Sequence, residues 1–130
     1  MENKTIIALK NISVEFDGEK VLDDLNLSIR DGEFVTLLGS SGCGKTTTLR
    51  LIAGFLEPDS GEVFFDGKSM NGVPPYKREV NTIFQRYALF PHYNVYENIA
   101  YGLRVRKVPE KQIREQVTEM LRLVNLQGFE

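Results

Sequence analysis

Residues 39–46 read Gly39-Ser40-Ser41-Gly42-Cys43-Gly44-Lys45-Thr46, and they match the pattern G-x-x-x-x-G-K-[ST] at every fixed position. This stretch follows an apolar run, Phe34 to Leu38, which predicts a buried strand. It precedes apolar residues that recur as on one face of a helix, at Leu49, Ile52, Ala53 and Leu56. Because strand, glycine-rich loop and helix follow one another in this order, the pattern predicts a phosphate-binding loop.

The residue types in this loop suit a nucleoside triphosphate. Gly39, Gly42 and Gly44 lack a Cβ atom, so the backbone can curl around an anion and direct its N–H groups inward. The first turn of the following helix adds unpaired N–H groups and the positive end of its dipole. Lys45 can place a charge on the β- and γ-phosphates, and the Thr46 hydroxyl can coordinate Mg²⁺. The alternative is a glycine-rich turn with an incidental lysine.

Composition places the chain among ordinary globular proteins. Its length of 130 residues is enough for one domain. Of these residues, 42% are hydrophobic and 26% are charged. A net charge of −2 argues against a nucleic-acid partner or a general attraction to an anionic membrane. We see no signal-peptide layout after Met1 and no apolar run of about 20 residues. A single cysteine fits a reducing, cytoplasmic location.

The first thirty residues predict an antiparallel hairpin. Apolar and polar residues alternate in part from Thr5 to Phe16 and again from Val21 to Ile29, as expected for two half-buried strands. The turn signal Asp17-Gly18 lies between them. Phe16 shares the face of the other apolar residues in its strand. The pattern therefore favours core packing for Phe16, with stacking on a nucleotide base as the alternative.

Two more strands and two more helices are expected beyond the loop. Val63–Phe65 predicts a short strand, and Val80–Gln85 predicts a strand that ends in a polar side chain. Asn94 and Glu97 have the spacing of a capping box at the start of a helix. A last amphipathic helix is expected from about Pro109.

The segments that follow the loop resemble a known family. Ile83-Phe84-Gln85 followed by Tyr87-Ala88-Leu89-Phe90-Pro91 is similar to the Q-loop of ABC-transporter ATPases. The run from Glu97 to Leu103 resembles the helix after that loop, and Gly32 to Thr47 is similar to the Walker A segment of bacterial importers. The resemblance covers essentially the whole chain.

The resemblance implies an α/β fold of the P-loop NTPase class, ABC ATPase type, that is incomplete within residues 1–130. We expect an N-terminal antiparallel β subdomain, the Walker A strand, loop and helix, a Q-loop strand and the start of a helical subdomain. The family's signature Leu-Ser-Gly-Gly-Gln, its Walker B strand and its switch histidine do not occur in the sequence. His92, the only histidine, is not in the switch position and is predicted to be a surface residue.

Site residues follow from the resemblance, position by position. Phe16 matches the aromatic residue on which the family stacks adenine. The expected ATP-binding residues are Phe16, Gly39, Ser40, Ser41, Gly42, Cys43, Gly44, Lys45, Thr46 and Thr47. Gln85 matches the glutamine that reaches Mg²⁺ and positions the attacking water, so Gln85 and Lys45 are the expected catalytic residues and Thr46 and Gln85 the expected Mg²⁺ ligands. A glutamine is not a strong base, and Arg86 departs from the small or polar residue expected beside it.

The family also implies partners and a location. Residues from Gln85 to His92 are expected to contact transmembrane permease subunits, with the ATPase as a homodimer on the cytoplasmic face of the membrane. Asn81–Gln85, with the Val73-Pro74 turn upstream, is most similar to ATPases of spermidine/putrescine importers. Importers of maltose, sulfate or iron are the alternatives.

Three expectations concern the 130 residues taken alone. Without the Walker B base and the signature loop, we expect binding of nucleotide without hydrolysis; the alternative is a truncated interaction module that catalyses nothing. A small P-loop kinase or GTPase is disfavoured because Asn-Lys-x-Asp is absent and the Q-loop would be unexplained.

The family places two absent strands between Phe34–Leu38 and Val80–Phe84, so we expect self-association or a rearrangement that pairs these two segments. Cys43, near a helix N-terminus, is expected either to be reactive or simply to fill the loop.

Overall fold

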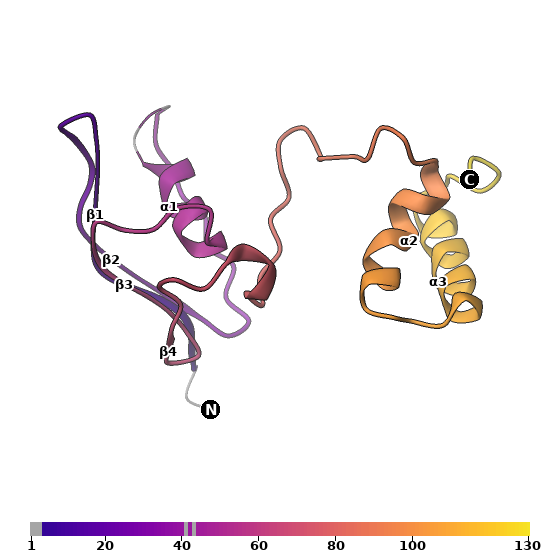
Figure 1. Ribbon diagram of the computed structural model, residues 1–130, viewed down its shortest axis with the longest axis horizontal. Coiled ribbons are helices and arrows are strands. Elements are labelled where there is room, and N and C mark those ends of the chain that lie inside the picture. Colours follow the sequence, from indigo (N-terminus) through magenta and orange to yellow (C-terminus); the bar gives the residue numbers. More distant parts are fainter. Residues whose placement is uncertain (1–3, 41, 43) are drawn as a thin grey trace. The chain divides into compact units, whose positions relative to one another are not determined.

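The computed structural model describes residues 4–40, 42 and 44–130. The chain divides into two compact units, of which the first ends at Thr82 and the second spans Ile83–Glu130. Each unit has its own hydrophobic core. Figure 1 labels the helices and strands of the two units. No helix in the described part of the chain has the length and apolar character that a membrane span requires.

An antiparallel sheet forms the frame of the first unit. Its four strands lie in the order β2-β1-β3-β4. The strands are β1 (Thr5–Phe16), β2 (Glu19–Arg30), β3 (Ser60–Phe65) and β4 (Lys68–Ser69). The predicted hairpin is confirmed, with the turn at Asp17-Gly18 between β1 and β2. The short strand predicted around Val63 is also confirmed and pairs with β1.

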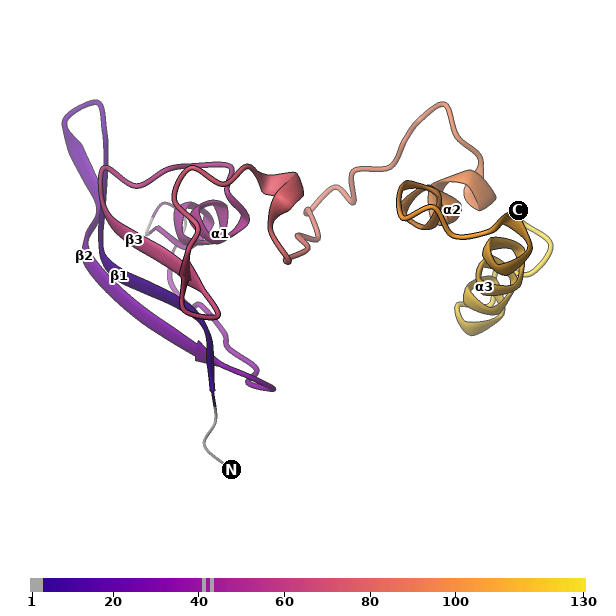
Figure 2. The same cartoon turned by 60° about the horizontal axis from the view of Figure 1, so that its bottom comes forward.

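The helix α1 (Lys45–Ala53) packs on one face of this sheet (Figure 2). The core between them contains Leu9, Ile12, Val14, Leu22, Leu51, Ile52 and Val63. The predicted helix face is partly wrong, because Leu49 is 53% exposed whereas Leu51 is 0% exposed. The helix is turned so that Leu51 and Ile52 meet the sheet together. It ends at Gly54, whose φ of 86° stops the helix and makes Leu56 part of the loop beyond it.

Two predicted strands do not form. Residues 34–38 and 80–84 belong to no strand, and Phe34 is 94% and Leu38 87% exposed. A strand is stable only when a neighbour pairs with its backbone groups. The described residues place no strand beside either segment, and the two segments do not pair with each other. The predicted rearrangement is therefore wrong, whereas self-association stays a prediction.

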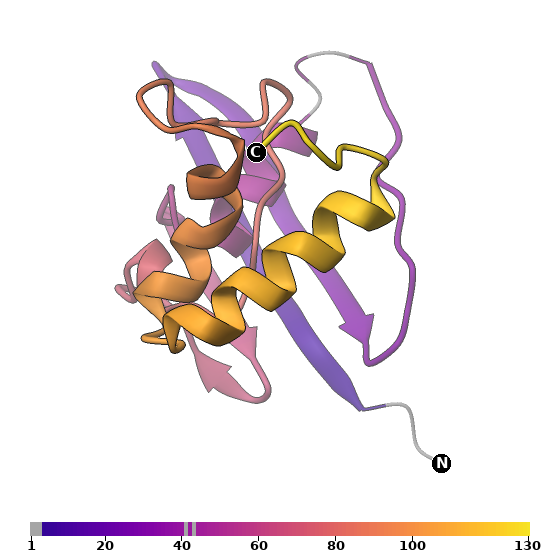
Figure 3. The same cartoon turned by 90° about the vertical axis from the view of Figure 1, so that its right-hand side faces the viewer.

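The second unit is a helical hairpin of α2 (Val95–Val105) and α3 (Glu110–Leu123). The two helices lie side by side (Figure 3). They bury Ala100, Ile113, Val117 and Leu121 between them. The predicted capping box is confirmed: Glu97 N donates to Asn94 Oδ1 over 2.7 Å, and Asn94 N donates to Glu97 Oε2 over 3.2 Å. The amphipathic helix after Pro109 is confirmed as well, with a narrow apolar stripe because Met120 is 45% exposed.

Candidate functional site

A hollow of about 460 Å³ lies where the β1–β2 hairpin meets the start of α1. The residues that line it are Phe16, Val21, Gly42, Gly44, Lys45, Thr46 and Thr47. The hairpin therefore contributes the end of β1 and the start of β2, and the loop contributes the glycines and the first turn of the helix. Six of these seven residues were predicted as nucleotide-binding from the sequence. Ser41 and Cys43, which were predicted with them, lie outside the described residues.

Phe16 does not pack in the core, so the pattern-based prediction for it is wrong. It is 45% exposed, whereas Ile12 and Val14 on the same strand face are 0% and 2% exposed. Phe16 is exposed because it is the last residue of β1 and lies next to the turn at Asp17-Gly18. Its ring instead borders the same hollow as Lys45. A nucleotide-stacking role for Phe16 stays a prediction.

The Lys45 side chain reaches back across the loop. Its Nζ donates hydrogen bonds to the carbonyl oxygens of Gly39 and Ser40, the latter over 3.2 Å. Both acceptors belong to the first residues of the loop pattern, so one lysine ties the start of the loop to its end. These two bonds hold a positive charge inside the loop.

Gly44 is the N-cap residue of α1 and permits the tight approach of the loop to the hairpin. Its φ is +93°, and a Cβ atom there would lie 2.7 Å from Leu22 Cδ2 and 3.3 Å from the carbonyl oxygen of Val21. No side chain caps this helix end, and the first turn carries no acidic residue. The first N–H groups of a helix have no partner within the helix. The end of α1 that faces the loop is therefore suited to an anion.

The three threonines of α1 have different environments. The Thr48 hydroxyl is buried and donates to the Gly44 carbonyl oxygen over 2.8 Å, which stabilises the first turn. Thr46 is exposed and Thr47 is partly exposed, and both line the hollow. An exposed threonine hydroxyl beside a lysine and a helix N-terminus fits a Mg²⁺ ion bound together with phosphate oxygens. Within the described residues there is no group of three or more acidic, histidine or cysteine side chains that would hold a metal by itself.

Gln85 lies in the second unit, in an exposed turn formed by residues 85–88. Tyr87 and Ala88 in this turn have positive φ angles of 59° and 50°, which non-glycine residues rarely adopt. His92 is exposed, as predicted. The structure does not place Gln85 relative to the phosphate loop, so its roles with Mg²⁺ and water stay predictions.

Sequence reasoning missed the residue that shapes this exposed segment, which is Asn98. Its side-chain amide donates to the carbonyl oxygens of Phe90, Tyr93 and Asn94 over 3.3, 3.1 and 2.9 Å, and its Oδ1 accepts from Phe90 N over 2.9 Å. Phe90 also packs on Tyr101, with ring centroids 4.5 Å apart. The sequence held a weak signal, since an asparagine in the first turns of a helix readily bonds to nearby backbone.

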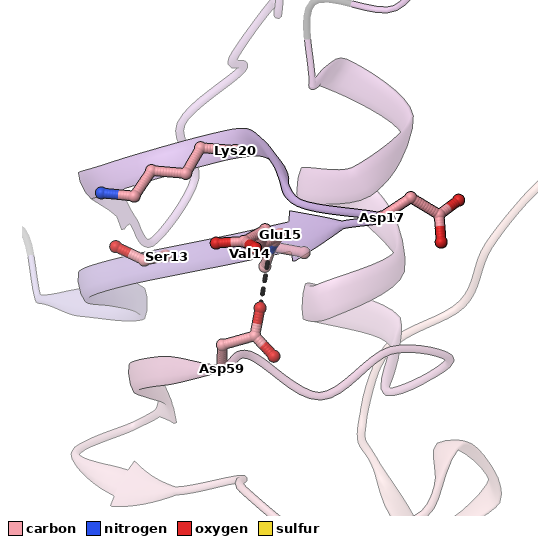
Figure 4. A pocket seen from close by; sticks show the side chains of 6 residues that line it. All are labelled: Ser13, Val14, Glu15, Asp17, Lys20 and Asp59. Atoms are coloured by element: carbon pink, nitrogen blue, oxygen red, sulfur yellow. Dashed lines mark hydrogen bonds between the residues drawn. The ribbon is translucent and has the colours of Figure 1, made fainter.

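A second hollow of about 360 Å³ lies along the hairpin and is lined by Ser13, Val14, Glu15, Asp17, Lys20 and Asp59 (Figure 4). Asp59 Oδ2 accepts a hydrogen bond from Glu15 N over 2.7 Å, which attaches the start of β3 to β1. Lys20 pairs with Asp23 at 3.1 Å. These contacts stabilise the hairpin and its attachment to β3.

Comparison with known proteins identifies what this arrangement resembles. The family model described as ABC transporter matches residues 22–130. The solved structure of cbiO1 from Clostridium perfringens, part of the ABC transporter complex cbiONQ, superposes with a TM-score of 0.76 and 28% identity. That match covers 97% of this chain and 53% of cbiO1.

Curated relatives are closer in sequence. The spermidine/putrescine import ATP-binding protein PotA of Clostridium acetobutylicum is 58% identical over 130 residues, which is 100% of this chain and 37% of that protein. PotA of Clostridium novyi is 57% identical over 127 residues, 98% of this chain and 37% of that protein. The chain thus spans little more than a third of the length of these relatives.

Proposed function

Because this chain belongs to the ABC transporter family, we propose that it binds ATP with Mg²⁺ as part of an importer ATPase for spermidine or putrescine. The observation that carries the proposal is the hollow shared by Phe16, Lys45 and Thr46. It combines an aromatic face, a fixed cation and a helix N-terminus around one space, which are the features that a base, phosphates and a metal ion need. The substrate class comes from the relatives alone.

Each residue of the hollow has a proposed role. The half-exposed ring of Phe16 stacks on adenine, since an aromatic ring beside a phosphate site can cover the base. The described backbone of the loop, residues 39–40, 42 and 44–47, surrounds the phosphates. Lys45 neutralises charge on the β- and γ-phosphates, and Thr46 holds Mg²⁺ through its hydroxyl. Mg²⁺, when bound, supplies further charge neutralisation between the phosphates.

Gln85 and the residues after it are proposed to serve two purposes. The Gln85 amide positions the attacking water and reaches Mg²⁺, which needs a polar group but not a base. The segment from Gln85 to His92 contacts transmembrane permease subunits on the cytoplasmic face of the membrane. Support comes from its exposed apolar side chains, among them Tyr87 at 75% and Leu89 at 71% exposure. Aromatic residues are enriched at protein interfaces.

Turnover requires groups that the 130 residues do not contain. Lys45 and Gln85 provide charge and orientation, while proton removal from water needs a base and the sequence has no Walker B segment. We infer that a polypeptide of these residues alone binds ATP without hydrolysing it. In the homodimer that we propose for the ATPase, each copy would complete the other's site with its signature loop.

Nucleotide titration of the purified chain tests the binding proposal. Calorimetry with ATP and Mg²⁺ should show saturable binding, and Lys45→Ala should abolish it because the cation at the phosphates is lost. Lys111→Ala is the matched control, since it removes one exposed lysine from α3 and should bind as the wild type does. Absence of binding by the wild type at millimolar ATP would refute the proposal.

Uptake measurements test the substrate class. Cells in which the gene encoding these residues is disrupted should lose ATP-dependent uptake of labelled spermidine or putrescine. Uptake of maltose, sulfate and iron in the same cells is the control and should be unchanged. Unimpaired polyamine uptake together with loss of one of the other three would contradict the polyamine assignment and leave the ATPase assignment intact.

A further inference from the structure

Arg78 is the one charged side chain that the described residues bury, and the role proposed above does not use it. The residue is 6% exposed and its side chain 1% exposed. Every nitrogen of its guanidinium has an acceptor. Nη1 donates to the carbonyl oxygens of Leu51 and Ile52 at 2.9 and 3.2 Å, Nε to Val73 O at 2.9 Å, and Nη2 to Met70 O at 2.8 Å and Glu57 Oε1 at 3.4 Å.

These contacts clamp one end of α1. The last carbonyl groups of a helix have no partner within the helix, and a cation there is favoured by the helix dipole. Arg78 supplies a hydrogen-bond donor and a positive charge to the carbonyl oxygens of Leu51 and Ile52. Its bonds to the carbonyl oxygens of Met70 and Val73 attach that helix end to the loop of residues 70–73. Burial lowers the pKa of the Arg78 guanidinium, while the Glu57 carboxylate raises it. An arginine stays charged despite such a shift.

Gly54 shows how closely the clamp fits. Its φ is +86°, and a Cβ atom on it would lie 2.5 Å from Arg78 Nε and 2.8 Å from Arg78 Cζ. The glycine that ends α1 is thus also the residue that allows the guanidinium to approach the helix end. Glu57 completes the arrangement, since its Oε1 accepts from both Arg78 Nη2 and Gly72 N, at 3.4 and 3.2 Å.

The opposite end of the same helix carries the phosphate site. Lys45 is the first residue of α1, and the helix has only nine residues. Residues 33–40, which lead into the loop, form no strand, so no sheet holds that side of the loop within the described residues. The position of Lys45 and Thr46 therefore depends on what holds α1, which is its apolar face on the sheet and the Arg78 clamp.

We propose that Arg78 is a positioning residue for nucleotide phosphates: it fixes the C-terminal end of α1 so that the N-terminal end presents Lys45 and Thr46 at the correct place. This role rests on the proposed function, since it concerns the same phosphate site. It acts at the far end of the helix and needs no contact with the ligand. A planar guanidinium fork is required, because a lysine carries the charge but cannot bond several carbonyls at fixed angles.

The test compares three variants of the whole chain. Arg78→Gln removes the charge and the fork, and Arg78→Lys keeps the charge alone. Arg50→Gln is the matched control: Arg50 lies in the last turn of the same helix, is exposed, and its loss changes the net charge equally. Dissociation constants for ATP and for tripolyphosphate, each with Mg²⁺, are measured well below the unfolding midpoint of each variant. Tripolyphosphate reports on the phosphate site without the adenine contact.

We expect Arg78→Gln to weaken both ligands roughly ten-fold, Arg78→Lys to weaken them by a smaller factor, and Arg50→Gln to leave them within about two-fold. A residue with only a structural role would lower the unfolding midpoint and leave both constants of the folded protein unchanged. That result overturns the proposal, as does an equal loss in Arg50→Gln. If Arg78→Gln does not fold, Arg78→Lys decides, and wild-type affinity in that variant overturns the proposal. Failure of the wild type to bind either ligand refutes the proposed function itself.

Discussion

Gly44 and Leu22 approach so closely that a Cβ atom on Gly44 would lie 2.7 Å from Leu22 Cδ2. The N-cap glycine of α1 therefore also sets how near the β1–β2 hairpin can come to the helix. Both the hairpin and the loop contribute to the candidate nucleotide site. This contact joins the fold of the sheet to the geometry of the site.

Gly44→Ala should destabilise the chain and weaken nucleotide binding. The left-handed backbone costs an alanine about 1–2 kcal/mol, and the contact with Leu22 adds about 1–3 kcal/mol of overpacking. Gly72→Ala is the control, because Gly72 has a similar φ of +76° and no atom within 4 Å of the built Cβ. Chemical denaturation measures both variants. Equal losses of unfolding free energy in the two would contradict the importance of the Leu22 contact.

The chain should not release phosphate from ATP above background. The physical reason is that the sequence has no Walker B segment to supply the base for the attacking water. A coupled phosphate-release assay on protein purified through two independent affinity steps measures the rate. Lys45→Ala is the control for contaminating ATPases, whose activity it cannot affect. A rate that persists through purification and disappears in Lys45→Ala would disprove the expectation.

Asn98→Ala should loosen the segment of residues 90–94 from α2. The change removes hydrogen bonds to Phe90, Tyr93 and Asn94, each worth about 0.5–1.5 kcal/mol net. Hydrogen exchange followed by mass spectrometry should show faster exchange in this segment. Gln112→Ala, on the exposed face of α3, is the control and should leave it unchanged. Unaltered exchange in Asn98→Ala would show that the aromatic contacts alone hold the segment.

The ion pair between Glu119 and Arg122 should make a pH-dependent contribution to the free energy of unfolding. The hydrogen bond from Arg122 lowers the pKa of the exposed Glu119 carboxyl below its ordinary value. A group with a lowered pKa in the folded state stabilises the protein above its unfolded-state pKa and loses that effect as pH falls through the folded-state pKa. The unfolding midpoint of Arg122→Gln should therefore lie slightly below that of the wild type at neutral pH. The two unfolding midpoints should converge in acid. A difference that persists in acid would point to lost packing instead.

The purified chain should self-associate with rising concentration. Phe34 and Leu38 are 94% and 87% exposed in a segment without a strand partner, and such segments recruit strands from other copies. Light scattering should show this, and Leu38→Glu should reduce it by placing a charge in the segment. Tyr76→Glu, at a position 83% exposed that lies outside residues 34–38 and 80–84, is the control. A monomer at all micromolar concentrations would contradict the prediction.

Features that depend on neighbours in sequence were predictable. The hairpin follows from alternation and Asp17-Gly18, and the start of α2 follows from Asn94 and Glu97, because turns and caps are formed by residues a few positions apart. The phosphate loop was recognisable for the same reason, since its glycines, Lys45 and Thr46 lie within eight consecutive positions. The chemistry of that loop is therefore determined by the sequence itself.

Three features of the protein depend on contacts between residues that are distant in the sequence, and only the tertiary structure shows them. Phe16 lies at the edge of the hollow and not in the core. The buried Arg78 holds the C-terminal end of α1 through hydrogen bonds to Leu51 O and Ile52 O. Residues 34–38 belong to no strand, although their apolar pattern suits one. A sequence pattern specifies which faces are apolar and where the chain turns, whereas burial and strand pairing require a partner that the pattern itself does not contain.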